Sequence, residues 1–277
     1  ASMTMDISSQ SKLGEFYEEL NRLDINVVRP NINKCYADFR SDNENFYYAL
    51  GAIKNVGFEA ISSIVEERKK NGKFKSINNF IERVNPKNLN KLQLEGLVKA
   101  GAFDSLVNNR QSLHDSIPNL ILKSKNIFEN KSINQINLFE GEEIIEEDLL
   151  KKIEDWKFED RLSKEFEAVG FFISDHPLNQ FRDSFEDYNI ISYIDFNNNE
   201  IKEANIAATI LKIQEKKTQK GSSYGIIKFS DLSNVFELFI FSEIFESNRQ
   251  KLLEGNSVML TLMKNYIDEN KSQKRIN

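Results

Sequence analysis

The sequence predicts a multidomain α+β protein that is mainly helical at its N-terminal end and built of strands at its C-terminal end. Apolar residues recur at three- and four-residue spacings over the first 130 residues, which is typical of helices packed on a core. Beyond about residue 200 the apolar period changes to two, as in strands. With 277 residues, 40% of them hydrophobic, the chain is long enough for two or three domains with cores of their own.

Turn signals divide the helical part. Ser9 or Ser11 can cap a first helix, a short strand is expected before Pro30, and Ser76 can cap a later helix. Gly and Pro residues end or bend helices at the expected boundaries. We expect helices at about 11–23, 60–71, 77–84, 89–100 and 109–128, the last bent or broken at Pro118.

The stretch from Leu50 to Arg68, LGAIKNVGFEAISSIVEER, is typical of a helix-hairpin-helix. If Gly57 has a positive φ, the backbone N–H groups of residues 55–58 can converge on one phosphate at the start of the next helix. A related turn, LVKAGAFDSL, follows at residues 97–106. On the pattern alone, an ordinary helical turn with a glycine is the alternative. The predicted contacts, which would address the DNA backbone without reading bases, are Lys54, Asn55, Val56, Gly57, Phe58 and Gly101.

The segment from about residue 124 to 145 is rich in Lys, Asn, Ser and Glu and is expected to be an exposed linker. Within it, NQINLFE places Leu138 beside Phe139, three residues after Gln135, where no core is predicted. Such a pair suits insertion into a pocket on a partner. Equally, both side chains could pack back onto neighbouring helices, because single exposed hydrophobic residues are common.

After the linker, residues 146–174 are expected to be helical again. His176 precedes Pro177 and has no nucleophile or metal ligands near it in sequence, so we interpret it as a turn or capping residue. The expected buried stripe of the helix consists of Leu149, Ile153, Trp156, Leu162, Phe166 and Val169.

Three strand-like runs at 204–214, 224–231 and 234–241, a helix at 242–253 and a strand at 257–264 follow in the order of an OB-fold, a five-stranded barrel that binds oligonucleotides. QKRIN supplies only the beginning of a fifth strand, so the barrel is expected to be incomplete. Phe229 and Phe239 could stack on bases, but aromatic residues here more often fill the barrel. The predicted single-strand contacts are Lys216, Lys217, Lys220 and Tyr224.

Composition excludes several other functions. Residues 140–160 hold ten acidic and three basic side chains, so the net charge of −6 is local and the rest of the chain sums to +1. Cys35, His114 and His176 are too few for a structural zinc site. No apolar run is long enough for a membrane span, which predicts a cytoplasmic protein. We find no catalytic residues, no metal ligands and no cofactor site, because closely spaced aspartates, a Walker loop and a catalytic triad are all missing.

In their order, these elements resemble the C-terminal part of the bacterial DNA polymerase III alpha subunits, the replicative C-family polymerases, over essentially all 277 residues. EFYEELNRLDINVVRPNIN, residues 15–33, resembles the end of the fingers, and YYALGAIKNVGFEAISSIVEER resembles the tandem hairpin region. Gln135, Leu138 and Phe139 match the family's internal Gln-x-x-Leu-Phe motif, which binds the sliding clamp. The resemblance implies duplex DNA, the sliding clamp, single-stranded DNA and other replisome subunits as partners.

The family's nucleotide addition uses Mg²⁺ on palm aspartates, which the resemblance places upstream of this chain. Because Ala1 is not an initiator Met, we expect that the chain was processed or cut from a longer protein, which would be a DNA-directed DNA polymerase. The resemblance divides the chain into an end-of-fingers region at 1–36, a tandem helix-hairpin-helix region at 37–130, a clamp-binding linker at 131–145, a helical connector at 146–195 and a truncated OB-like domain at 196–277.

Two other interpretations remain at this stage. The chain could be a free-standing accessory or repair protein that joins a hairpin module to an OB domain and recruits a clamp. A nuclease with a hairpin domain is disfavoured, because the sequence has no clustered carboxylate and Lys site.

Overall fold

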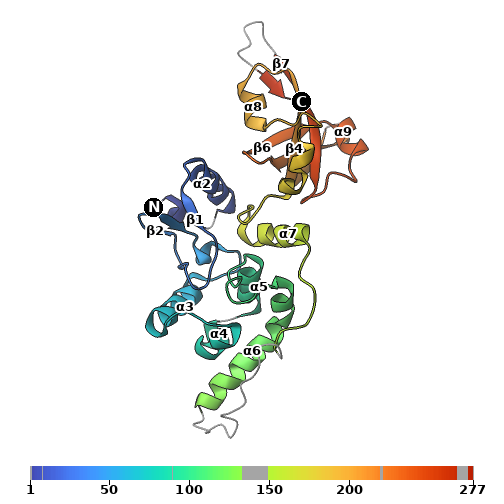
Figure 1. Ribbon diagram of the computed structural model, residues 1–277. Coiled ribbons are helices and arrows are strands. Elements are labelled where there is room, and N and C mark those ends of the chain that lie inside the picture. Colours follow the sequence, from blue (N-terminus) through green and yellow to red (C-terminus); the bar gives the residue numbers. More distant parts are fainter. Residues whose placement is uncertain are drawn as a thin grey trace. The chain divides into compact units, whose positions relative to one another are not determined.

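The computed structural model describes residues 2–7, 9–88, 90–132, 149–218, 221–266 and 274–276. The chain divides into two compact units, residues 1–174 and 175–277, each with its own hydrophobic core. Figure 1 shows the helical first unit and the sheet of the second unit along the chain. The predicted α+β class is confirmed, with helices first and an antiparallel sheet after them.

The first unit consists of helices around a small three-stranded sheet, in which β3 lies between β1 and β2. β1 pairs with β3 in parallel, and β2 pairs with it antiparallel. The elements are α1 (Ser2–Met5), α2 (Gln10–Arg22), β1 (Asn26–Val28), β2 (Arg40–Ser41), β3 (Asn45–Tyr47), η1 (Leu50–Ala52), α3 (Phe58–Asn71), α4 (Ile77–Arg83), η2 (Pro86–Asn88), α5 (Lys91–Lys99), α6 (Arg110–Ser132) and α7 (Phe158–Val169).

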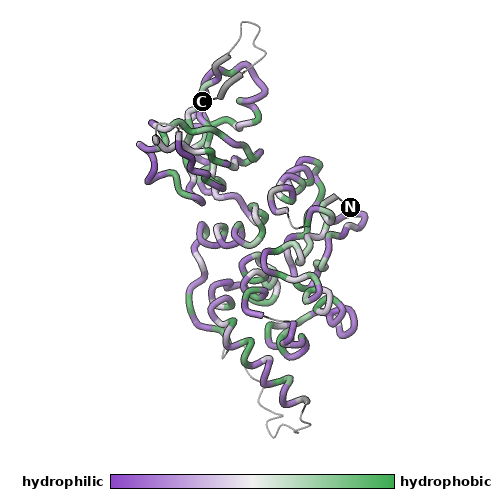
Figure 2. The backbone as a smooth tube through the Cα atoms, turned by 180° about the vertical axis from the view of Figure 1, so that it is seen from behind, coloured by the Kyte–Doolittle hydropathy of each residue, from purple (hydrophilic) through white to green (hydrophobic). Residues whose placement is uncertain are grey.

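Local capping explains where several of these helices begin. The predicted cap at Ser76 is confirmed, since its side chain accepts a hydrogen bond from the backbone N–H of Asn79 at the start of α4. Asn90 and Gln93 form a capping box at α5, in which each side chain accepts from the other residue's backbone N–H. α6 continues through Pro118. Its tube alternates between apolar and polar colours in Figure 2, as expected of a helix with one face on the core.

The core of the first unit is aromatic at its centre. Phe80 is fully buried and makes edge-to-face contacts with Phe74 and Phe103, with ring centroids 5.0 Å apart in both pairs. These rings come from the region before α4, from α4 itself and from the turn after α5, so they join the two hairpin regions into one body.

Of the helix expected over residues 146–174, only α7 at residues 158–169 forms in the described part, so the prediction is wrong for residues 149–157 and 170–174. Residues 149–157, here called the strap, run along the first turns of α6 without helical structure. Ser116 and Lys151 connect them, because Ser116 Oγ accepts from the Lys151 backbone N–H at 2.9 Å. Asp155 Oδ1 accepts from the Gln111 backbone N–H, also at 2.9 Å. The Lys151 N–H, which a helix would have paired internally, thus bonds to α6 instead.

The second unit is built on one five-stranded sheet with the order β6-β5-β4-β7-β8, antiparallel throughout. The helix between the third and fourth strands is present as predicted, but it ends at Ser247 rather than near residue 253. The elements are η4 (Pro177–Ser184), α8 (Tyr193–Asn198), β4 (Glu203–Lys217), β5 (Ser223–Ser230), β6 (Val235–Ile240), α9 (Ser242–Ser247), β7 (Ser257–Tyr266) and β8 (Lys274–Ile276).

β4 is the strand that curls the sheet. Its first half pairs with β7 and its second half with β5, and the two ladders meet at Thr209. A register shift between Ile210 and Lys212 marks a bulge, and bulges bend strands. Phe196 and Phe229 are fully buried against the concave side of this sheet. Because the edge strands β6 and β8 are not paired with each other within the described residues, the result is an incomplete OB-like barrel.

His176 is the N-cap of η4, as the sequence predicted. Its Nδ1 accepts from the Leu178 backbone N–H at 3.2 Å, and its Nε2 lies 3.1 Å from Ser230 Oγ on β5. Burial lowers the pKa of His176 from 6.5 to about 4, although the charges of Asp231 and Asp175 oppose the shift. The imidazole is therefore neutral in the folded protein at neutral pH.

We predict that protonation at His176 destabilises the second unit. Because the folded pKa lies below the unfolded one, the stabilisation is complete above about pH 6.5 and is lost as the pH falls towards about 4. The loss is at most about 3 kcal/mol in the free energy of unfolding. Urea unfolding of the parent and of His176→Asn, which retains a capping oxygen, measures it. Equal pH dependence in both proteins would contradict the assignment.

Candidate nucleic-acid interface

The first hairpin connects η1 to α3, but its left-handed residue is not the one that the sequence suggested. Gly57 has φ −79° and ψ 137° and is the N-cap of α3, so its expected positive φ is wrong. Asn55 takes that conformation instead, with φ 64°. The Val56 backbone N–H donates to Ile53 O at 3.0 Å and closes the turn one residue earlier than expected. Asn tolerates the left-handed region better than most residues, which permits this placement.

This hairpin presents four of its five predicted contact residues to solvent. Lys54, Asn55 and Gly57 are exposed, and the ring of Phe58 is 50% exposed. Val56 is the exception, because its side chain is 7% exposed and belongs to the core of the first unit. Only its backbone could therefore take part in a surface contact.

The N-terminus of α3 opens beside these residues. No side chain in the described part of the chain caps it, and its first intrahelical bond runs from the Ile61 N–H to Gly57 O. The N–H groups of the first turn thus lack intrahelical acceptors and carry the positive end of the helix dipole. Glu59 in the same turn partly offsets this charge. An oxyanion at this position would receive backbone N–H groups and the charge of Lys54.

α5 packs against the first hairpin, and Gly96 of α5 makes this close approach possible. A Cβ on Gly96 would lie 2.7 Å from Lys54 O, so α5 packs directly against the hairpin backbone. From the other side, the Lys54 backbone N–H donates to Ala168 O near the end of α7 at 2.9 Å. Elements from three parts of the sequence therefore fix the hairpin in place.

The second hairpin connects α5 to α6, with Gly101 in its turn at φ 76°. Gly101 is buried, and a Cβ there would overlap the guanidinium of Arg110. Its lack of a side chain lets Arg110 cross the turn. The structure gives Gly101 a packing role, and its predicted DNA contact stays a prediction.

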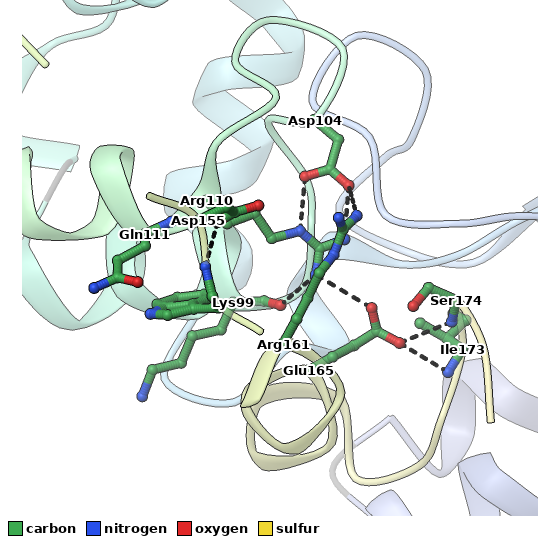
Figure 3. A network of polar contacts seen from close by, with 10 residues as sticks. Lys99, Asp104, Arg110, Gln111, Asp155, Arg161, Glu165, Ile173 and Ser174 are labelled. Atoms are coloured by element: carbon green, nitrogen blue, oxygen red, sulfur yellow. Dashed lines mark hydrogen bonds and ion pairs between the residues drawn. The ribbon is translucent and has the colours of Figure 1, made fainter. Parts of the chain in front are cut away.

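Arg110 is the centre of a buried ionic network (Figure 3). Its Nε and Nη2 donate to the two carboxylate oxygens of Asp104 at 2.8 and 2.6 Å. Its Nη1 donates to Lys99 O at 3.1 Å and to Glu165 Oε2 at 3.3 Å. Burial alone lowers the pKa of Arg110, but the hydrogen bonds and charges of Asp104 and Glu165 outweigh it and raise that pKa. Arg110 is 3% exposed, and its guanidinium remains charged.

Glu165 connects this network to the end of α7. Its side chain is fully buried, and Oε1 accepts from the backbone N–H groups of Ile173 and Ser174 at 3.1 and 2.7 Å. Neither Glu165 nor Arg110 is among the residues predicted from the sequence. A signal existed for Glu165, because it lies three residues after Leu162 on the predicted apolar stripe, where an acidic residue needs a buried partner.

In the second unit Lys216 and Tyr224 share one face of the sheet, whereas Lys217, the next residue on β4, points to the other face. Lys216 and Tyr224 are directly opposite each other on β4 and β5, and Lys217 follows at the exposed end of β4. The Tyr224 ring lies 4.7 Å from that of Phe239, which in turn lies 5.0 Å from Phe241. Phe239 is 43% exposed, whereas Phe229 is buried in the core. Lys220 lies outside the described residues.

Gln135, Leu138 and Phe139 also lie outside the described residues. On either side of them, α6 ends at Ser132 and the strap begins at Leu149.

Over the ranges that the structure describes, no group of three His, Cys, Asp or Glu side chains could hold a metal ion. Cys35 is buried, which raises the pKa of its thiol to about 11. None of the helices in the described parts has the length and apolar character of a membrane span.

Comparison with known protein families places both hairpins in one motif. A helix-hairpin-helix motif family matches residues 24–113, from the start of the small sheet to the first turn of α6. The match therefore includes Lys54–Phe58, α5 and the turn at Gly101.

Relatives extend the similarity to nearly the whole chain. The chain is 32% identical over 266 residues to DNA polymerase III subunit alpha of Borreliella burgdorferi, which covers 93% of this chain and 23% of that protein. This chain is a homologue of the DNA polymerase III alpha subunits. The alpha subunit of Caulobacter vibrioides is 31% identical over 267 residues, 94% of this chain and 23% of its own length. That of Rickettsia conorii is 37% identical over 217 residues, 77% of this chain and 18% of its own length. The chain thus spans less than a quarter of these alpha subunits.

Proposed function

We propose that this chain is a DNA-binding part of a replicative DNA polymerase alpha subunit and holds duplex DNA by its backbone. The observation that carries the proposal is the first hairpin, where Lys54, Asn55 and Gly57 are exposed at the uncapped start of α3 within the helix-hairpin-helix match. A phosphate bound there would meet backbone N–H groups and one lysine. Contacts of this kind carry no base information, as a polymerase that must copy every sequence requires.

In the intact protein we assign DNA-directed nucleotide addition, and the Mg²⁺ ions that it uses, to carboxylates outside residues 1–277. This chain would contribute affinity and position. Other replisome subunits would be further partners of the intact protein.

We further propose that the second unit contacts single-stranded DNA. Support comes from the exposed Lys216, which lies opposite Tyr224 on the face where the rings of Tyr224, Phe239 and Phe241 adjoin, and from the exposed Lys217 at the end of the same strand. Lysines can follow a phosphate backbone while aromatic rings stack on bases of any sequence. The strand order and the helix between the third and fourth strands fit an OB-fold, whose sheet face is used in this way.

For the sliding clamp we propose Gln135, Leu138 and Phe139 as the contact. The support is the Gln-x-x-Leu-Phe motif itself and its position in the chain. α6 precedes the motif, and the strap that follows it is hydrogen-bonded to α6. If Leu138 and Phe139 insert into a pocket of the clamp, the clamp is bound next to the DNA-binding unit.

The duplex-binding proposal predicts a uniform loss of affinity when the hairpin is changed. Lys54→Gln should lower the slope of log affinity against log salt by about one, equally on duplexes of unrelated sequence. Fluorescence anisotropy over a salt series measures this slope. Lys69→Gln, at the opposite end of α3, is the matched control. A loss that depends on base sequence, or no loss at all, would refute backbone recognition by this hairpin.

The clamp proposal predicts that Leu138→Ala together with Phe139→Ala removes binding. An anchor residue of this kind contributes about 2 kcal/mol, or about 30-fold in affinity, so removal of both should lower the affinity for a purified sliding clamp by at least about 30-fold and by several hundred-fold if the two losses add. Calorimetric titration measures it, with Leu122→Ala, an exposed leucine on α6, as control. Equal affinity of parent and double variant for the clamp would show that this motif is not the clamp contact.

A further inference from the structure

A pocket with a volume of about 530 Å³ lies in the first unit, and no residue of the first hairpin lines it. Its walls come from the segment that follows β1, from the second hairpin and from α7. Pockets of this size commonly hold small ligands or parts of larger ones. Nothing in the proposed function so far uses it.

The charged side chains at the floor of the pocket already have partners within the chain. Arg110 and Glu165 both line it, and their charged groups are occupied by each other, by Asp104 and by backbone groups of the chain. A buried and paired floor is rigid, so the shape of the pocket is set before any ligand arrives.

The rim carries cations that the floor does not neutralise. Arg29 and Lys34 are exposed, and neither forms an ion pair with a carboxylate of the described residues. Arg161 reaches Asp104 with one nitrogen, Nη2, at 3.3 Å. The lining contains four basic residues, these three and Arg110, against the two carboxylates Asp104 and Glu165, a net charge of +2.

We propose that this pocket binds a phosphate group, with Arg29, Lys34 and Arg161 as its ligands, and that the phosphate belongs to the backbone of the bound duplex. Guanidinium groups pair with phosphate oxygens through parallel hydrogen bonds, and a lysine adds a flexible charge. Arg29, Lys34, Gly101 and Arg110 all fall within the helix-hairpin-helix match at residues 24–113. The inference rests on the proposed duplex binding and adds a second point of contact, beside the second hairpin.

A second contact of this kind explains how the region of the second hairpin could bind DNA although Gly101 is buried. Side chains that surround the turn, rather than its backbone N–H groups, would hold the phosphate. Arg110, which Gly101 allows to cross the turn, would keep the pocket in shape without touching the ligand.

The test is the variant Arg29→Gln with Lys34→Gln, measured by fluorescence anisotropy on a duplex over a salt series. We expect the slope of log affinity against log salt to fall by about one for each cation removed. Lys69→Gln with Lys75→Gln, which removes two exposed charges elsewhere in the first unit, should leave the slope unchanged. Because Arg29 and Lys34 are exposed, thermal unfolding should match that of the parent and show that the variant is folded.

Calorimetric titration with pyrophosphate tests whether the pocket binds phosphate in the absence of duplex DNA. A parent that binds duplex with the same slope as the Arg29/Lys34 variant overturns the inference and leaves the first hairpin as the duplex contact. A parent that does not bind duplex refutes the proposed function instead. In that case the duplex is not the source of the phosphate. Pyrophosphate binding by the parent but not by the variant would then show that the pocket holds a phosphate from another source, and no binding by either would overturn the pocket as a phosphate site.

Discussion

A buried ion pair between Arg110 and Glu165 connects parts of the first unit that are far apart in the sequence. Arg110 opens α6 and crosses the second hairpin to Asp104, while Glu165 lies on α7 and accepts from the backbone beyond that helix. Two charges in a buried site are costly unless each meets its partner, and removal of one partner commonly costs about 3–5 kcal/mol. The pair therefore fixes where α7 lies against α5 and α6.

The position of α7 in turn determines the geometry of the first hairpin. Ala168, near the end of α7, accepts from the Lys54 backbone N–H, and Gly96 of α5 lets the same hairpin pack closely from the other side. Both hairpins are thus held in place by elements from other parts of the first unit. A surface fixed in this way loses little conformational entropy on binding, which favours a contact that must form on any sequence.

Local rules predicted much of this architecture, and contacts across long sequence separations account for the errors. The cap at Ser76 and the strands β4, β5, β6 and β7 followed from capping and from the period of two, which depend on neighbouring residues only. The strap was mistaken for helix because its apolar spacing is helical, whereas bonds from Lys151 and Asp155 to α6 decide its path. Gly57 was assigned the left-handed turn position that Asn55 occupies, since composition alone does not locate a turn to the residue.

The most direct test of this account is a double-mutant cycle on Arg110→Met and Glu165→Met, followed by urea unfolding of the first unit. Each single variant leaves a buried charge without its partner and should lose about 3–5 kcal/mol in the free energy of unfolding. The double variant should lose clearly less than the sum, with a coupling energy of at least about 1 kcal/mol. If the two losses simply add, the ion pair is not the constraint that holds the hairpins and α7 together.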